Sequence, residues 1–207
     1  MTYNCRCPCC RSEIPRSDAT ALAMIKRGAA AGKADSLICL AGSYEYGQLG
    51  LKVDLARAVK YYSAAADAGS ARACLCLGNL YIAGKGVKRC RAAGARLFAR
   101  AVGIGSVSAL YSLGSCLWDG CGVERDRAEA LRLFKLGSDR GEPQCTRQLA
   151  RAHAHGHGPL TVNRAEAVYY YRRAADAGDL TSRRVLANLY AEDIVDAAWA
   201  ADAPGGL

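Results

Sequence analysis

Glycines recur along this chain of 207 residues at intervals of 36 or 37 residues. Two series share this interval, the first made of Gly32, Gly69, Gly105, Gly141 and Gly178, and the second, about midway between them, of Gly47, Gly84, Gly120 and Gly156. A fixed period of this length is the signature of repeat proteins, in which one small unit is copied along the chain. Each unit therefore consists of two segments that are joined by a glycine turn.

Within each unit, the apolar residues follow the period of an α-helix. Ala73, Leu77 and Tyr81 recur every four residues in a first segment, and the pair Leu97 and Phe98 begins the corresponding pattern in a second segment. The composition agrees with a folded protein, since 51% of the residues are hydrophobic and only 23% are charged. Both segments are predicted to be amphipathic helices, with Leu77 and the aromatic pairs in the core.

The turns carry residues that suit helix ends. Oxygen-bearing side chains that can cap the second helix stand in three of the four units, at Asp54, Asp126 and Asn163. The remaining position, in the second unit, holds Cys90, which is a poor cap, so the second helix of this unit should lack about 1 kcal/mol of stabilisation at its start. Gly84 is expected to end a first helix, and Gly105 to close a second helix in the left-handed conformation.

Packing explains two glycines that lie inside predicted helices. Gly78 and Gly114 each cost about 1 kcal/mol relative to alanine, which predicts a neighbouring helix too close to admit a Cβ atom.

Since units are stabilised by their neighbours, truncating the central Leu113 should cost about 2 to 5 kcal/mol, and truncating the terminal Leu186 should cost less.

The stretch Leu77-Gly78-x-x-Tyr81-x-x-Gly84-x-Gly86-Val87, with its counterpart from Leu113-Gly114 to Asp126, resembles Sel1-like repeats, which are relatives of the tetratricopeptide repeat. The resemblance implies an all-α fold, a right-handed α-solenoid of stacked antiparallel helix pairs. It divides the chain into a Cys-rich tail (1–16), a solenoid (17–192), and a C-terminal cap and tail (193–207). The solenoid contains four full repeats, at 33–69, 70–105, 106–141 and 142–178, and a capping helix on each side of them.

The resemblance also implies a function, which is a non-catalytic scaffold that binds a protein or peptide on its concave face. The first helix of each unit would line this groove, with the side chains Ile38, Leu75, Asn79, Ile82, Tyr111, Ser115, Trp118, Arg147, Arg151 and Arg184. Such a groove is apolar in its N-terminal half and basic in its C-terminal half. It suits a peptide with hydrophobic anchors followed by acidic residues or a free C-terminus. The alternative is that these arginines form ordinary solvated surface.

Several functional classes are disfavoured by the sequence. The glycine turns lack the preceding strand and the Gly-Lys-Ser/Thr ending of a phosphate loop, and no catalytic triad stands outside the repeat pattern. The net charge is +9, but the arginines are scattered among acidic residues, so nucleic acid is not expected as a partner. Without a long apolar stretch or a signal peptide, we expect a monomeric protein of the cytoplasm or nucleus that uses no membrane.

The 11 cysteines raise a second interpretation. The stretch Cys7-Pro8-Cys9-Cys10 has the spacing of half a zinc site and resembles the last ligand pair of a RING finger, with Cys7 and Cys10 as the candidate ligands. The six preceding ligands are absent. The alternative function is therefore the substrate-recruiting part of a RING-type ubiquitin-ligase-like protein with a truncated zinc module. If the tail binds no metal, we expect the protein to have no cofactor.

The three histidines alternate around the fourth glycine turn, at 153, 155 and 157. Helical metal ligands pair four residues apart, so this alternation fits a metal site poorly. His153 is expected to replace the core tyrosine of the other units, and His155 and His157 to be exposed.

Overall fold

The computed structural model describes residues 17–191, and all regular structure in this range is helical. The ten helices are α1 (Asp18–Ala30), α2 (Ala34–Tyr46), α3 (Leu55–Asp67), α4 (Ala71–Ala83), α5 (Arg91–Gly103), α6 (Val107–Asp119), α7 (Arg127–Asp139), α8 (Pro143–His155), α9 (Arg164–Asp176) and α10 (Leu180–Ala191). The predicted all-α fold is confirmed. None of these helices is long and apolar enough to cross a membrane.

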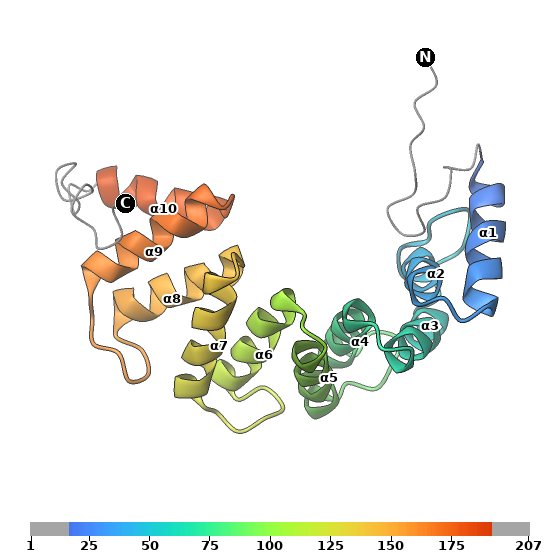
Figure 1. The fold of residues 1–207 in the computed structure, drawn as a ribbon, viewed down its shortest axis with the longest axis horizontal. Coiled ribbons are helices and arrows are strands. Elements are labelled where there is room, and N and C mark those ends of the chain that lie inside the picture. The colour runs from blue at the N-terminus through green and yellow to red at the C-terminus, as the bar shows by residue number, and fades with distance from the viewer. Residues whose placement is uncertain (1–16, 192–207) are drawn as a thin grey trace, which may run out of the picture. The chain divides into compact units, whose positions relative to one another are not determined.

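The chain forms two compact units, each larger than one repeat: unit 1 is Met1–Ser106 and unit 2 is Val107–Leu207. In its described part, unit 1 contains α1 to α5 and unit 2 contains α6 to α10. Within each unit, every helix packs against the next one along the chain. Figure 1 shows α8 and α9 side by side as a hairpin, which is the arrangement expected for one repeat. The first helices are α2, α4, α6, α8 and α10, and the second helices are α1, α3, α5, α7 and α9.

The predicted helix caps are present. The side chains of Asp54, Asp126 and Asn163 accept the backbone N–H three residues further on, at 2.9, 2.9 and 3.1 Å. Cys90 makes no such bond at the start of α5, as predicted. Gly105 has φ +99° and follows the end of α5, where the N–H of Ser106 donates to the carbonyl of Ala101. The prediction of left-handed closure is therefore also confirmed.

The two mid-helix glycines accommodate aromatic rings. A Cβ atom built on Gly78 would lie 2.5 Å from Cε1 of Phe98, and one built on Gly114 would lie 2.6 Å from Cε1 of Phe134. Each ring comes from the second helix of the repeat to which its glycine belongs, Phe98 from α5 and Phe134 from α7, and both are almost fully buried. The predicted close approach is confirmed, with an aromatic side chain as the group that fills the space.

The burial of the repeat leucines departs from expectation in α6. Leu113 is only half-buried, whereas Leu186 in α10 is 8% exposed. Leu110, at 1% exposure, takes the deep position on α6. Because α6 is the first helix of unit 2, it is covered within this unit mainly by α7. The larger stability cost for Leu113→Ala than for Leu186→Ala stays a prediction, but the burial of the two leucines does not favour it.

Candidate partner-binding surfaces

In unit 1, few of the predicted groove residues reach solvent. Ile38 is 6% exposed and belongs to the core of α2. Ile82 is half-buried and faces α5, because a Cβ atom on Gly94 would lie 2.7 Å from its Cγ1. Leu75 is half-buried and Asn79 is exposed, both on α4. The first-helix face of unit 1 therefore offers mainly Leu75 and Asn79 to a partner.

In unit 2, the aromatic residues of α6 lean on α7. The ring of Tyr111 lies 6.4 Å from that of Phe134, and the ring of Trp118 lies 6.0 Å from it. The guanidinium carbon of Arg127 stands 5.3 Å from the centre of the Trp118 ring, a cation–π distance. Tyr111 and Trp118 are half-buried, so each has a surface left over for a partner, whereas the hydroxyl of Ser115 is buried and has no hydrogen-bond partner among residues 17–191.

The predicted groove residue Arg147 has a partner inside the protein. Its Nη1 lies 3.2 Å from Oδ1 of Asp179, and the two side chains are only 20% and 11% exposed. The other oxygen of Asp179 accepts the N–H of Ser182 at 2.7 Å, which caps the first turn of α10. Arg147 therefore joins α8 to the start of α10, and a partner carboxylate would compete with Asp179 for it.

The other two predicted arginines are more accessible. Arg151 is exposed and donates only a long bond of 3.4 Å to Gln148. Arg184 is exposed, without a hydrogen bond or ion pair to another residue between 17 and 191. Burial raises the pKa of the Tyr171 hydroxyl, and the charges of Arg151 and Arg147 oppose this rise. Both guanidinium groups therefore lie close to one buried hydroxyl on α9.

The histidines pack against aromatic rings. His153 stacks on Tyr170 with ring centres 5.5 Å apart, which fits the expected replacement of a packed tyrosine. His155 is exposed as expected, but His157 is half-buried and meets the Trp118 ring edge-on at 5.8 Å. The expectation that His157 is exposed is wrong because Trp118 covers it. Between residues 17 and 191, no three potential metal ligands gather in one place.

The cysteines of the described helices are packing residues. Cys74, Cys116 and Cys145 are buried and form no disulfide, and among the cysteines between residues 17 and 191 only Cys90, just before α5, is exposed. Burial raises the pKa of Cys116 to about 11 and that of Cys145 to about 12, so both stay protonated and unreactive near neutral pH. The candidate zinc ligands Cys7 and Cys10 lie outside the described residues.

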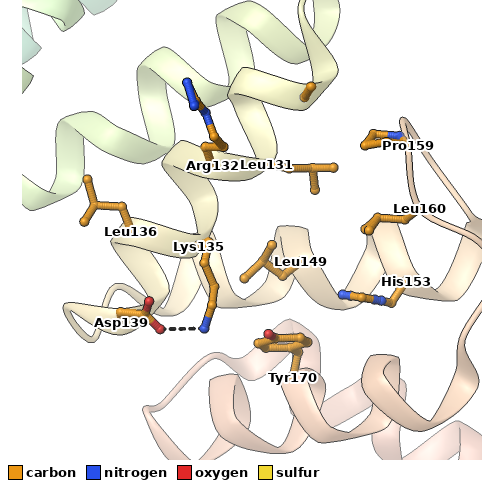
Figure 2. A pocket seen from close by; sticks show the side chains of 11 residues that line it. Leu131, Arg132, Lys135, Leu136, Asp139, Leu149, His153, Pro159, Leu160 and Tyr170 are labelled. Atoms are coloured by element: carbon orange, nitrogen blue, oxygen red, sulfur yellow. Dashed lines mark hydrogen bonds and ion pairs between the residues drawn. The ribbon is translucent and has the colours of Figure 1, made fainter.

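A pocket of about 600 Å³ opens between α7, α8 and α9, on the second-helix side of unit 2. Leu131 and Leu149 give it apolar walls, and Figure 2 shows Lys135 paired with Asp139 at one side, at 2.9 Å. A smaller pocket of about 350 Å³ lies at the equivalent place among α3, α4 and α5. Sequence reasoning missed both, because each is lined by side chains from three helices.

An arginine links the two second helices that border each pocket, α3 with α5 and α7 with α9. Nη2 of Arg100 donates to the carbonyl of Ala66 at 2.6 Å, and Nη2 of Arg173 donates to the carbonyl of Ser138 at 2.9 Å. Both arginines also face the last aspartate of the preceding second helix, Asp67 or Asp139, at 3.5 and 3.8 Å. The guanidinium satisfies free carbonyls at a helix C-terminus, so it holds successive second helices together.

Comparisons with known proteins agree with this architecture. The Sel1 repeat family model matches residues 37–70, 107–142 and 143–179, which together make more than half of the chain. No curated protein matches the sequence. A Sel1 repeat protein of Oxalobacter formigenes has a similar structure, with a TM-score of 0.80 and 26% identity over 86% of this chain and 70% of that one.

Two further solved structures share the fold. The protective antigen c5321 of uropathogenic Escherichia coli has an SLR fold and is 21% identical, with a TM-score of 0.55 over 85% of this chain and 45% of that one. The immunity protein Pa5087 of Pseudomonas aeruginosa is 17% identical, with a TM-score of 0.56 over 82% and 62% of the two chains. The repeats, their glycine turns and these matches agree: the chain belongs to the Sel1 repeat family.

Proposed function

We propose that the chain is a non-catalytic scaffold that binds a protein or peptide through the first-helix face of unit 2. Sel1 repeats generally serve as protein–protein interaction scaffolds. One observation carries the proposal to this face. The repeat position of Leu149 holds leucine in every repeat, whereas the position two residues earlier changes from Leu75 to Tyr111 to Arg147. A position that packs in the core keeps the same type of side chain from repeat to repeat, whereas a position that contacts a partner changes its side chain.

The partner is an acidic segment or a free C-terminus next to an apolar anchor. Arg151 and Arg184 supply exposed guanidinium groups, which bind carboxylates through two parallel hydrogen bonds. Tyr111, half-buried on α6 of the same unit, supplies an aromatic surface for the anchor. Arg147 supports the arrangement through its ion pair with Asp179 and is not the first choice for contact.

Charge reversal at the two exposed arginines tests the proposal. Proteins captured from cell extract by the wild type should be lost by the double variant Arg151→Glu and Arg184→Glu, and capture should weaken as salt rises. Arg147 is left intact, because a glutamate there would stand against Asp179 and disturb the fold. The control reverses Arg140 and Arg164, two exposed residues of unit 2 outside its first helices. Identical captured proteins and salt dependence for the two double variants would contradict the proposal.

The RING-type ligase interpretation gains no support. Its candidate ligands Cys7 and Cys10 lie outside the described residues, and the family match covers repeats only. The scaffold alone is therefore proposed, and it needs no resident cofactor because the helical repeats build their own core.

A further inference from the structure

The second repeat, residues 70–105, carries positive charge and no carboxylate of its own, although Arg100 pairs with Asp67 of the preceding helix at 3.5 Å. Between Asp67 and Asp119 the chain contains no aspartate or glutamate. The same stretch contains seven cations, all of them exposed: Arg72, Lys85, Lys88, Arg89, Arg91, Arg96 and Arg100. The net charge of the whole chain is +9, so this stretch contributes most of the excess.

Three of these cations, Lys85, Lys88 and Arg89, lie on the turn between α4 and α5, and Arg91 begins α5. We name the segment 85–91 the basic turn. Nε of Arg89 donates to the carbonyl of Ile82 at 3.0 Å, and its Nη1 and Nη2 have no hydrogen-bond or ion-pair partner in the described part of the chain. The other three make no side-chain hydrogen bond or ion pair with any residue between 17 and 191. Their charges are therefore available to a partner.

The backbone holds the basic turn in place. The N–H of Lys85 donates to the carbonyl of Leu80, and the N–H of Cys90 donates to that of Tyr81, each at 3.0 Å. Gly86 lies so close to α3 that a Cβ atom on it would be 2.5 Å from the carbonyl oxygen of Leu55. A turn fixed in this way loses little conformational entropy when its side chains bind a ligand.

The repeat itself shows that the fold does not require this charge. The equivalent turn of unit 2 alternates Glu124, Arg125, Asp126 and Arg127, so its charges cancel. Asp126 also caps α7 there, whereas the basic turn has Cys90 at this place and no cap. The second repeat therefore combines repulsion among its cations with a missing helix cap, and neither is explained by stability.

We infer that the basic turn binds an acidic segment of a protein partner, rich in aspartate and glutamate. Lysine and arginine side chains form their strongest hydrogen bonds with carboxylates. Single-stranded nucleic acid would also be attracted, but it binds with aromatic side chains on which bases stack, and the basic turn has none. This surface belongs to unit 1 and the first-helix face proposed above belongs to unit 2, and different residues form them, so each proposal can fail without the other.

Charge neutralisation measures the contribution of the basic turn. Labelled polyglutamate should bind the wild type with an affinity that falls as salt rises, and the triple variant Lys85→Gln, Lys88→Gln and Arg91→Gln should bind it about tenfold more weakly. The control variant Lys26→Gln, Lys60→Gln and Arg140→Gln removes the same net charge from exposed sites elsewhere. It should stay within about twofold of the wild type.

Position 90 provides a second test that separates binding from folding. Cys90→Asp adds both the missing cap and a carboxylate among the cations, so it should raise the melting temperature but weaken polyglutamate binding severalfold. Cys90→Asn adds the cap without the charge, so it should raise the melting temperature and leave binding unchanged.

Three outcomes would overturn the inference. The first is a wild type that does not bind polyglutamate even at low salt. The second is an equal loss of affinity in both triple variants, which would assign the effect to net charge. The third is tighter binding of polyuridylate than of polyglutamate, lost on neutralising the basic turn, which would assign this surface to nucleic acid.

Discussion

At the scale of single residues, this protein depends on glycines that leave room for aromatic rings. Gly78 and Gly114 stand opposite Phe98 and Phe134, and the same relation recurs one repeat apart. An added methyl group would force the ring or the helix to move, and overpacking of this kind costs about 1 to 3 kcal/mol. The glycine thus fixes how closely the two helices of a repeat approach.

Replacement of Gly114 by alanine should therefore lower the free energy of unfolding by about 1 to 3 kcal/mol. The control is Gly103→Ala, since Gly103 also lies in a helix but a Cβ atom there would meet nothing within 4 Å. That change should stabilise the protein by about 0.5 to 1 kcal/mol, because alanine favours the helix. Urea unfolding of the two variants measures both values, and a stabilised Gly114→Ala would show that the ring gives way freely.

Residue roles set by the local backbone could be predicted from the sequence, and roles set by distant partners could not. The caps at Asp54 and Asp126 act on amides three residues away, so their spacing reveals them. The ion pair of Arg147 and Asp179 joins residues 32 positions apart, and it depends on the side-chain directions of two different helices. The sequence therefore indicated a charged surface at Arg147 without showing that this arginine is already occupied.

At the scale of helices, α6 shows how position within a unit changes which face is buried. Its buried residues are Ala109, Leu110, Gly114 and Cys116, while Leu113 stays half-exposed. The leucine at the same repeat position is 5% exposed in α4 and 4% exposed in α8. The repeat pattern predicts that a helix exists and where it ends, but burial depends on which neighbours cover it.

Truncation of the two leucines of α6 should separate these contributions. Leu110→Ala should cost about 2 to 5 kcal/mol, because the side chain is 1% exposed and leaves a cavity. Leu113→Ala should cost less, since part of its surface already meets water. Denaturant unfolding at one temperature gives both differences. Equal costs would mean that Leu113 is covered in solution by more than the helices of unit 2.

At the scale of the whole molecule, stability in a repeat protein is the sum of many contacts between neighbouring helices. Each consecutive helix pair within a unit is in contact, and arginine links such as that of Arg173 to Ser138 reach only the next second helix. A local defect is therefore expected to loosen its own unit first. Two compact units within 207 residues give this expectation a clear boundary at residue 106.

Amide hydrogen exchange can show whether this boundary exists in solution. Leu77→Ala removes a side chain that is 5% exposed in the core of α4, so exchange should accelerate most in α3, α4 and α5. The amides of α8 and α9, which belong to unit 2, should keep protection factors close to those of the wild type. Leu149→Ala is the matched change in unit 2, with 4% exposure at the same repeat position, and it should give the reverse distribution. If either variant accelerated exchange equally in all these helices, the chain would unfold as one cooperative body, because energy lost in one unit would then be shared by both.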